Sequence, residues 1–154
     1  MIRFEKSDLE KASSVLFSES VQVRFQDVDA AGVVFFARFL DYVHQAYEAL
    51  LEKVGVDLPG VLRSREWAAP LRHVEADYRS PAFFGDLLSV ELVAAEIQET
   101  EISLGWRLNC NSGARPRAVA VVQSVHTFIA PETRQRSPVP AAIRDGLAAL
   151  QAAV

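Results

Sequence analysis

One long amphipathic helix constrains the fold of this chain more than any other sequence feature. Apolar residues recur with the helical period from Phe39 to Val54, and polar residues fill the opposite side of the same segment. Gly55 stands where a helix C-terminal cap is expected. A helix with one dominant apolar stripe needs one sheet to cover it. The rest of the chain must therefore supply strands.

Strand patterns occur on both sides of this helix. Residues 18–27 alternate before it, with Val21, Val23 and Phe25 on one side. Four segments follow it: RHVEADYRS (72–80), LLSVELVAAEI (87–97), EISLGWRLN (101–109) and RAVAVVQSVHTFI (117–129). The last is almost continuously apolar, which indicates a central strand. We predict an α+β fold in which the four later strands form an antiparallel meander and a five-stranded antiparallel sheet wraps around the helix.

The remaining segments connect or flank these elements. Residues 56–70 are predicted to be irregular with one helical turn, and residues 141–151 form a short amphipathic helix. A length of 154 residues fits one domain with a substantial core. We expect a single domain over residues 1–154, in which residues 1–17 are an N-terminal extension.

Composition excludes several classes of function. The net charge of −4 disfavours non-specific nucleic-acid binding. No apolar run approaches the ~20 residues of a membrane span, and the N-terminus lacks a signal core, so a cytoplasmic protein is expected. A lone Cys110 offers no disulfide framework, and neither His73 nor His126 has metal-ligand spacing to it. We expect no metal and no cofactor.

The stretch RFQDVDAAGVVFFARFLDYVH (24–44) joins the first strand to the helix. Aspartates in such a loop commonly cap a helix or form an Asx-turn. If the strand continued, Asp27 and Asp29 would point the same way and one pKa would rise. We expect Asp27 to brace the loop by bonding backbone amides or an arginine, Arg24 or Arg38. Gly32 permits a backbone conformation closed to other residues.

This stretch resembles the opening signature of the hotdog-fold thioesterases of the 4-hydroxybenzoyl-CoA thioesterase family. The resemblance continues through HVEADYRSPAFFGDLLSVEL and loosely to RSPVPAAIRDGL, so it covers most of residues 18–147. Within the family, ARFLDYVHQAYEALL is similar to the 1,4-dihydroxy-2-naphthoyl-CoA hydrolases of quinone biosynthesis. The resemblance implies a thioester hydrolase for an aromatic acyl-CoA. Alternatives are a 4-hydroxybenzoyl-CoA or short-chain acyl-CoA thioesterase, and a non-catalytic acyl-CoA or acyl-carrier binding module.

The resemblance also implies roles for three residues of the loop. The second aspartate of the family motif is its catalytic carboxylate, which is Asp29 here. It would attack the thioester carbonyl directly or act as a general base for water. The family places an oxyanion donor seven residues later, at the backbone amide of Phe36. Gly32 would shape the loop so that backbone amides approach the carbonyl.

Binding residues and assembly follow from the same comparison. Phe35, His44 and Trp67 are candidates for the acyl pocket, although each also fits a packing role. The phosphates of coenzyme A need a basic patch, and the visible pairs are Arg115 with Arg117 and Arg134 with Arg136. The family pairs subunits edge to edge into dimers, and many members are tetramers. The apolar character of residues 117–129 favours at least a dimer, and we expect a homotetramer.

Overall fold

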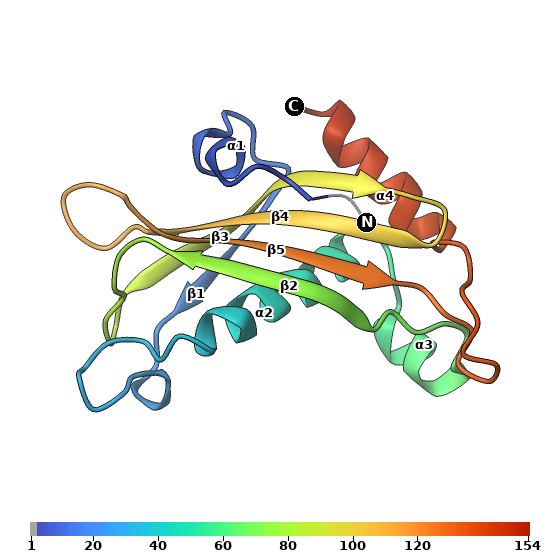
Figure 1. Ribbon diagram of the computed structural model, residues 1–154, viewed down its shortest axis with the longest axis horizontal. Coiled ribbons are helices and arrows are strands. Elements are labelled where there is room, and N and C mark those ends of the chain that lie inside the picture. Colours follow the sequence, from blue (N-terminus) through green and yellow to red (C-terminus); the bar gives the residue numbers. More distant parts are fainter. Residues whose placement is uncertain (1–2) are drawn as a thin grey trace.

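The computed structural model describes residues 3–154, so Met1 and Ile2 of the predicted extension (residues 1–17) lie outside it. Five strands form one antiparallel sheet in the order β1-β3-β4-β5-β2, and the long helix α2 lies along one face (Figure 1). The predicted α+β fold, a five-stranded antiparallel sheet around a long helix, is confirmed. The elements are α1 (Lys6–Lys11), β1 (Phe17–Gln22), a 3₁₀ turn (Phe25–Asp27), α2 (Arg38–Lys53), α3 (Leu58–Ser64), β2 (Leu71–Tyr78), β3 (Leu87–Ile97), β4 (Glu101–Cys110), β5 (Arg117–Thr127) and α4 (Ala141–Ala152).

The apolar stripe of α2 forms the centre of the core, as its periodicity predicts. Its buried residues include Phe39, Ala46 and Leu50, and the helix ends before Gly55, which has a φ of +90°. Every second residue of β3 and β4 contributes the opposing surface, with Trp106 fully buried. Burial of this surface supplies most of the apolar contact that holds the helix in place.

The first strand is shorter than its alternating sequence predicts. β1 ends at Gln22, and the chain then forms a 3₁₀ turn, so Phe25 is 79% exposed instead of facing the core with Val21. The cause is a local side-chain bond, because Asp27 Oδ2 accepts the amide hydrogen of Arg24 (2.9 Å). Such bonds offer the backbone an alternative to the sheet ladder. The prediction of a strand over residues 18–27 is therefore wrong at its C-terminal end.

The four later strands do not form a simple meander. β3, β4 and β5 are consecutive neighbours, but β2 pairs with β5 at the far edge of the sheet. The segment between β2 and β3 does not fold back as a hairpin. It pairs instead with the loop before α2, where Val34 donates to the carbonyl of Ala82 (2.8 Å) and Val33 bridges Phe83. The connection thus runs from the edge strand β2 to β3, next to the opposite edge strand β1, and passes beside the start of α2.

The N-terminal segment covers part of the outer face of the sheet, opposite α2 (Figure 1). Leu9 is only 1% exposed and lies over Gly105, where an added Cβ would come within 2.4 Å of it. The side chain of Gln123 bonds both the amide and the carbonyl of Phe4 (2.8 Å each). β5 is thus buried on both faces within one chain. Its apolar character therefore does not by itself argue for a dimer.

Asp27 ties the loop before α2 to the helix itself. Its side chain is buried, accepts a hydrogen bond from the hydroxyl of Tyr42 (2.8 Å) and lies 3.9 Å from the guanidinium of Arg38. Burial and the bond to Asp27 raise the pKa of Tyr42, so this residue remains a donor. With the amide of Arg24, the carboxylate has three partners. The expected bracing role of Asp27 is confirmed.

We expect Asp27→Asn to destabilise the fold. The variant loses a charge-assisted acceptor in a buried position, which costs about 1–3 kcal/mol. Asp41→Asn is the matched control, because Asp41 is exposed and its one ion-pair partner within residues 3–154 is Arg38, a surface interaction worth about 0–1 kcal/mol. Urea unfolding followed by circular dichroism measures both values. Equal losses in the two variants would contradict the bracing role.

Glu101 joins three segments at the other end of the sheet. Its carboxylate is 4% exposed and accepts hydrogen bonds from Arg72 of β2 and from Arg136 (2.9 Å), beyond β5. Burial raises the pKa of this carboxyl, but the hydrogen bond from Arg136 and the charge of Arg72 outweigh it, and the net pKa lies below its usual 4.5.

Because the pKa of Glu101 is lowered on folding, its contribution to stability is present above the unfolded pKa and is lost as the pH falls through the folded value. We expect Glu101→Gln to lower the free energy of unfolding by about 1–2 kcal/mol at pH 7. The difference from wild type should shrink below pH ~4.5. Urea titrations at pH 7, 5 and 3.5 test this, and a difference that stays constant with pH would contradict it.

Candidate active site

The loop between β1 and α2 is a small hairpin. Val28 bridges Val34, and the amide of Asp29 donates to the carbonyl of Val33 (2.9 Å). The amide of Gly32 donates back to the carbonyl of Asp29 (3.0 Å), and Gly32 has a φ of +80°. Asp at the first turn position and Gly at the fourth, with positive φ, are typical of a type I turn followed by a glycine bulge. Gly32 therefore shapes the backbone, and its own amide is already used.

Asp29 stands at the exposed end of this hairpin. Its Oδ1 accepts the amide hydrogen of Ala31 (2.8 Å), which forms the Asx-turn expected for such a residue. Unlike Asp27, two residues before it, Asp29 is exposed to solvent. The 3₁₀ turn, not a continuing strand, separates the two carboxylates. Asp29 is therefore free to reach a bound molecule.

The start of α2 presents backbone amides without competition from a capping side chain. Ala37 is the N-cap residue and makes no side-chain cap. Phe36 precedes this N-cap residue, and within residues 3–154 its amide has no acceptor, whereas the amide of Arg38, the first residue of α2, donates to the carbonyl of Phe35 (2.9 Å). A free amide at the positive end of a helix suits a developing oxyanion. The amide of Phe35, one residue before Phe36, donates to the carbonyl of Asp27 (2.9 Å). This bond attaches the amide of Phe36 to the hairpin that carries Asp29.

A cavity of about 340 Å³ opens beside this helix start. Phe36 and Phe39 line it from the helix side, and Tyr78 of β2 lines it from the sheet. The hydroxyl of Tyr78 donates to the carbonyl of Phe36 (2.9 Å), and its ring lies 5.3 Å from that of Phe39. The sequence predicted a strand over residues 72–80, which contains Tyr78, but gave no sign of this bond. Tyr78 fixes the peptide that follows Phe36.

The three predicted acyl-pocket residues do not meet at one point. The ring of Phe35 is 45% exposed and packs on Phe36 at 4.6 Å. His44 lies two turns further along α2 and lines two cavities, one of about 330 Å³ with Trp67 and one of about 140 Å³ between α2 and the sheet. Trp67 also packs against Phe128, with ring centroids 5.5 Å apart. Only His44 and Trp67 share a cavity, whereas Phe35 precedes α2, and the binding roles of all three stay predictions.

Two of the four arginines predicted for coenzyme A already have partners within the chain. Arg117 pairs with Asp86 (2.9 Å) and bonds Ser80 and the carbonyl of Pro81, which holds the β2–β3 connection against β5. Arg136 bonds Glu101. Arg115 and Arg134 are exposed in turns. The turn of residues 111–116 lies at the same end of the sheet as the hairpin, and Arg134 lies in a segment at the opposite end (Figure 1).

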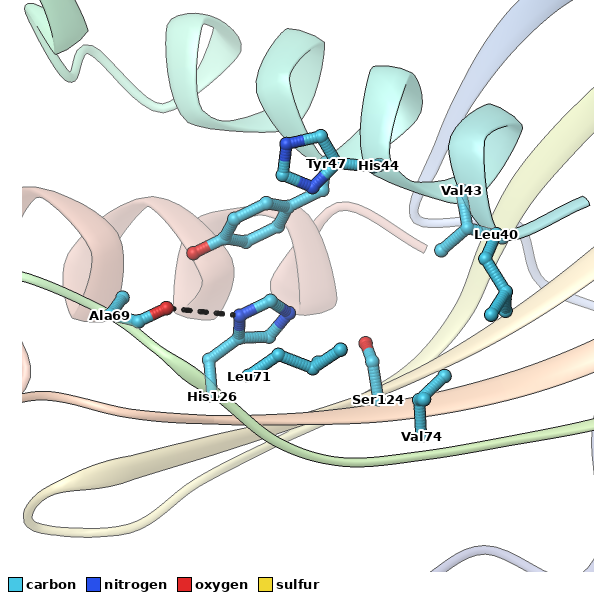
Figure 2. A pocket seen from close by; sticks show the side chains of 9 residues that line it. All are labelled: Leu40, Val43, His44, Tyr47, Ala69, Leu71, Val74, Ser124 and His126. Atoms are coloured by element: carbon cyan, nitrogen blue, oxygen red, sulfur yellow. Dashed lines mark hydrogen bonds between the residues drawn. The ribbon is translucent and has the colours of Figure 1, made fainter. Parts of the chain in front are cut away.

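Another cavity, of about 140 Å³, lies between α2 and the sheet (Figure 2). Its polar side chains are those of His44 and Tyr47 from α2 and of Ser124 and His126 from β5. Sequence reasoning gave Tyr47, Ser124 and His126 no binding role, and only the folded sheet brings Ser124 and His126 of β5 opposite α2. Within residues 3–154, no group of three His, Cys, Asp or Glu side chains could hold a metal ion. In the same range, no helix combines the length and apolar character needed to cross a membrane.

Comparison with known proteins places the chain in a family. The model of the thioesterase-like superfamily matches residues 23–147. A 1,4-dihydroxy-2-naphthoyl-CoA hydrolase from Synechococcus elongatus is 38% identical over 126 residues, which are 81% of this chain and 90% of the relative. Another protein of that name, from Rippkaea orientalis, is 36% identical over 116 residues, or 75% and 83% of the two chains.

A solved structure agrees with this placement. The 1,4-dihydroxy-2-naphthoyl-CoA thioesterase from Synechocystis superposes with a TM-score of 0.80 at 29% identity, covering 88% of this chain and 97% of that one. The family match begins at Val23, so the segment that covers the outer face of the sheet precedes it. The matched region contains the hairpin, the start of α2 and all of β2 to β5. The chain belongs to the thioesterase-like superfamily and has its hotdog fold.

Proposed function

We propose that this protein is an acyl-CoA thioesterase that hydrolyses 1,4-dihydroxy-2-naphthoyl-CoA to the free acid and CoA, a step of menaquinone or phylloquinone biosynthesis. The observation that carries the chemistry is the hairpin before α2, which presents the exposed carboxylate of Asp29 and leads into the unbonded amide of Phe36. The names of the relatives from Synechococcus elongatus and Synechocystis support the acyl group.

The proposed chemistry assigns one role to each group. The thioester carbonyl oxygen accepts the amide hydrogen of Phe36, and the positive end of α2 stabilises the negative charge that develops on that oxygen. The carboxylate of Asp29 then attacks the carbonyl carbon, forming a mixed anhydride that water hydrolyses, or takes a proton from the water that attacks. Either route releases the CoA thiolate, which is protonated, and the free acid. Phe35, His44 and Trp67 are the proposed contacts of the acyl group.

The phosphates of coenzyme A would meet arginines that have no partner elsewhere in the fold. Arg117 and Arg136 hold structural carboxylates, so they are the weaker candidates. Arg115 is the stronger one, because its turn lies at the end of the sheet that carries the hairpin (Figure 1). A guanidinium suits a phosphate group through paired hydrogen bonds.

We further propose that the chain forms a single domain and that it assembles in the cytoplasm as a homo-oligomer. The assembly would be a dimer at least, and a tetramer by analogy with the family. β2 supports this assembly, because it is an edge strand that pairs only with β5 among the described residues. An unpaired edge is a template for another chain. Exposed apolar side chains line it, namely Leu71 (52%) and Tyr78 (43%). Pairing there would cover both.

We expect Asp29→Asn to abolish most of the hydrolysis while the protein still folds. The asparagine oxygen can still accept the amide of Ala31, so the turn is kept, but the nucleophile or base is lost. kcat should fall by at least about 10²-fold. Asp41→Asn, an exposed acid on the polar side of α2, is the matched control and should retain full activity. Near wild-type turnover by Asp29→Asn would contradict the mechanism.

The substrate assignment is tested by comparing kcat/KM for three thioesters of CoA. The panel contains 1,4-dihydroxy-2-naphthoyl, 4-hydroxybenzoyl and butyryl groups, with release of the thiol as the readout. We expect the highest value for the naphthoyl thioester. A higher value for either of the others would assign the protein to the corresponding alternative substrate. Binding without turnover of any of them would indicate a non-catalytic acyl-CoA module.

A further inference from the structure

An oxyanion donor must point at a fixed place, and α2 alone gives the amide of Phe36 little support. Phe36 lies two residues before Arg38, the first residue of the helix. The amide of Phe39 reaches the carbonyl of Phe36 only at 3.4 Å, which is a long hydrogen bond. The ring of Phe36 is 61% exposed, so packing contributes little. Restraints from outside the helix must therefore set the direction of this amide.

The turn of residues 35–38, which carries this amide, is anchored at two points. At the first, the amide of Phe35 donates to the carbonyl of Asp27 (2.9 Å), which attaches the turn to the hairpin. At the second, the hydroxyl of Tyr78 donates to the carbonyl of Phe36 (2.9 Å), which attaches the turn to β2. A turn held at one point can still pivot about it, whereas two anchors fix its orientation. The bond from Tyr78 is therefore needed to direct the amide of Phe36.

The side chain of Tyr78 is itself held in place. Its ring lies 5.3 Å from that of Phe39, and its backbone pairs with Ala120 of β5. A carbonyl only accepts hydrogen bonds, so the hydroxyl must be the donor. Burial raises the pKa of Tyr78 above its usual 10, so the hydroxyl keeps its proton at neutral pH. Tyr78 thus offers a stable donor at the edge of the proposed site.

The residues on either side of Tyr78 are fastened to the N-terminal helix α1. Successive side chains of a strand point to opposite faces, so the neighbours of Tyr78 reach the outer face of the sheet. There Asp77 pairs with Lys6 (2.8 Å), and Arg79 pairs with Glu10. These contacts hold the end of β2 from the side opposite α2. The second anchor of the turn is therefore attached to a supported strand, although β2 lies at the sheet edge.

We propose that Tyr78 is a positioning residue for thioester hydrolysis, whose hydroxyl keeps the amide of Phe36 directed at the oxygen that becomes negatively charged. The inference rests on the proposed function. Both residues line the cavity of about 340 Å³ at the helix start. Because the charge on the oxygen develops in the transition state, the alignment should affect turnover and leave the affinity for substrate unchanged.

Tyr78→Phe tests this role, because it removes the hydroxyl and keeps the ring beside Phe39. We expect kcat for 1,4-dihydroxy-2-naphthoyl-CoA to fall about tenfold, since small misplacements of a reacting group are costly, and KM to change less than about twofold. Ser64→Ala is the matched control. The hydroxyl of Ser64 also donates to a main-chain carbonyl, that of Val61 (3.3 Å), but in α3, beyond the C-terminal end of α2 (Figure 1). This variant should keep the wild-type kcat.

Binding is measured apart from turnover in the Asp29→Asn background. Titration calorimetry compares Asp29→Asn with Asp29→Asn/Tyr78→Phe, using the same thioester. The two Kd values should agree within about twofold, because the amide is needed for the transition state. The number of binding sites per chain gives the folded fraction, and kcat is expressed per site. A Kd weakened about tenfold by Tyr78→Phe would show that Tyr78 binds the substrate, which would overturn the positioning role.

A vibrational measurement tests the alignment itself. A donor that bonds the thioester carbonyl polarises it and lowers its stretching frequency. Infrared difference spectra of a thioester labelled with ¹³C at this carbonyl are recorded for the same two Asp29→Asn proteins. The shift on binding should be smaller in the protein that also carries Tyr78→Phe. An equal shift in both would overturn the inference, because damage to the fold elsewhere does not change the frequency of bound substrate.

The remaining outcomes separate this inference from the proposed function. If wild-type protein hydrolyses the thioester and Tyr78→Phe keeps its kcat, the inference is overturned while the thioesterase function stands. If wild-type protein hydrolyses no acyl-CoA thioester, the proposed function fails, and the inference fails with it. A lower kcat with unchanged Kd in Tyr78→Phe, together with full activity in Ser64→Ala, supports the inference.

Discussion

The hydrogen bond from Tyr42 to the buried carboxylate of Asp27 is the contact on which the geometry of the site depends. It joins the turn after β1 to the second turn of α2. The same carboxylate accepts the amide of Arg24, and the carbonyl of Asp27 accepts the amide of Phe35. Asp27 therefore holds together the end of β1, the hairpin and the start of α2. A buried ionised acceptor with several donors is costly to disturb, so the loop has one conformation.

This brace explains why two aspartates so close in sequence differ in environment. The 3₁₀ turn places Asp27 against α2, and the hairpin that follows carries Asp29 out to solvent. Among the described residues, the carboxylate of Asp27 has three partners, and that of Asp29 accepts one local hydrogen bond, from the amide of Ala31. A group that is to meet a substrate must remain free of strong partners. The division of roles follows from burial, not from the residue type.

The seam between α2 and β2 gives the proposed site its direction. The amide of Phe36 stands at one end, where the positive end of the helix favours a negative oxygen. Apolar side chains follow for several turns, and the stacked pair of Tyr47 and His126 stands further along. The seam therefore runs from a polar end, through an apolar stretch, to hydrogen-bonding groups of α2 and β5. The seam also lies at the sheet edge formed by β2.

The sequence by itself determined the long helix, the strands that cover it and the loop motif, because periodic burial and turn chemistry depend on neighbouring residues. The stripe from Phe39 to Val54 and the alternation through Trp106 could be predicted for this reason. Only the tertiary structure decided that β2 pairs with β5, because strand order depends on which segment crosses the start of α2. The same holds for Ser124 and His126. They lie some 80 residues from the helix that they face, and no local pattern records which side chains a sheet brings opposite a helix.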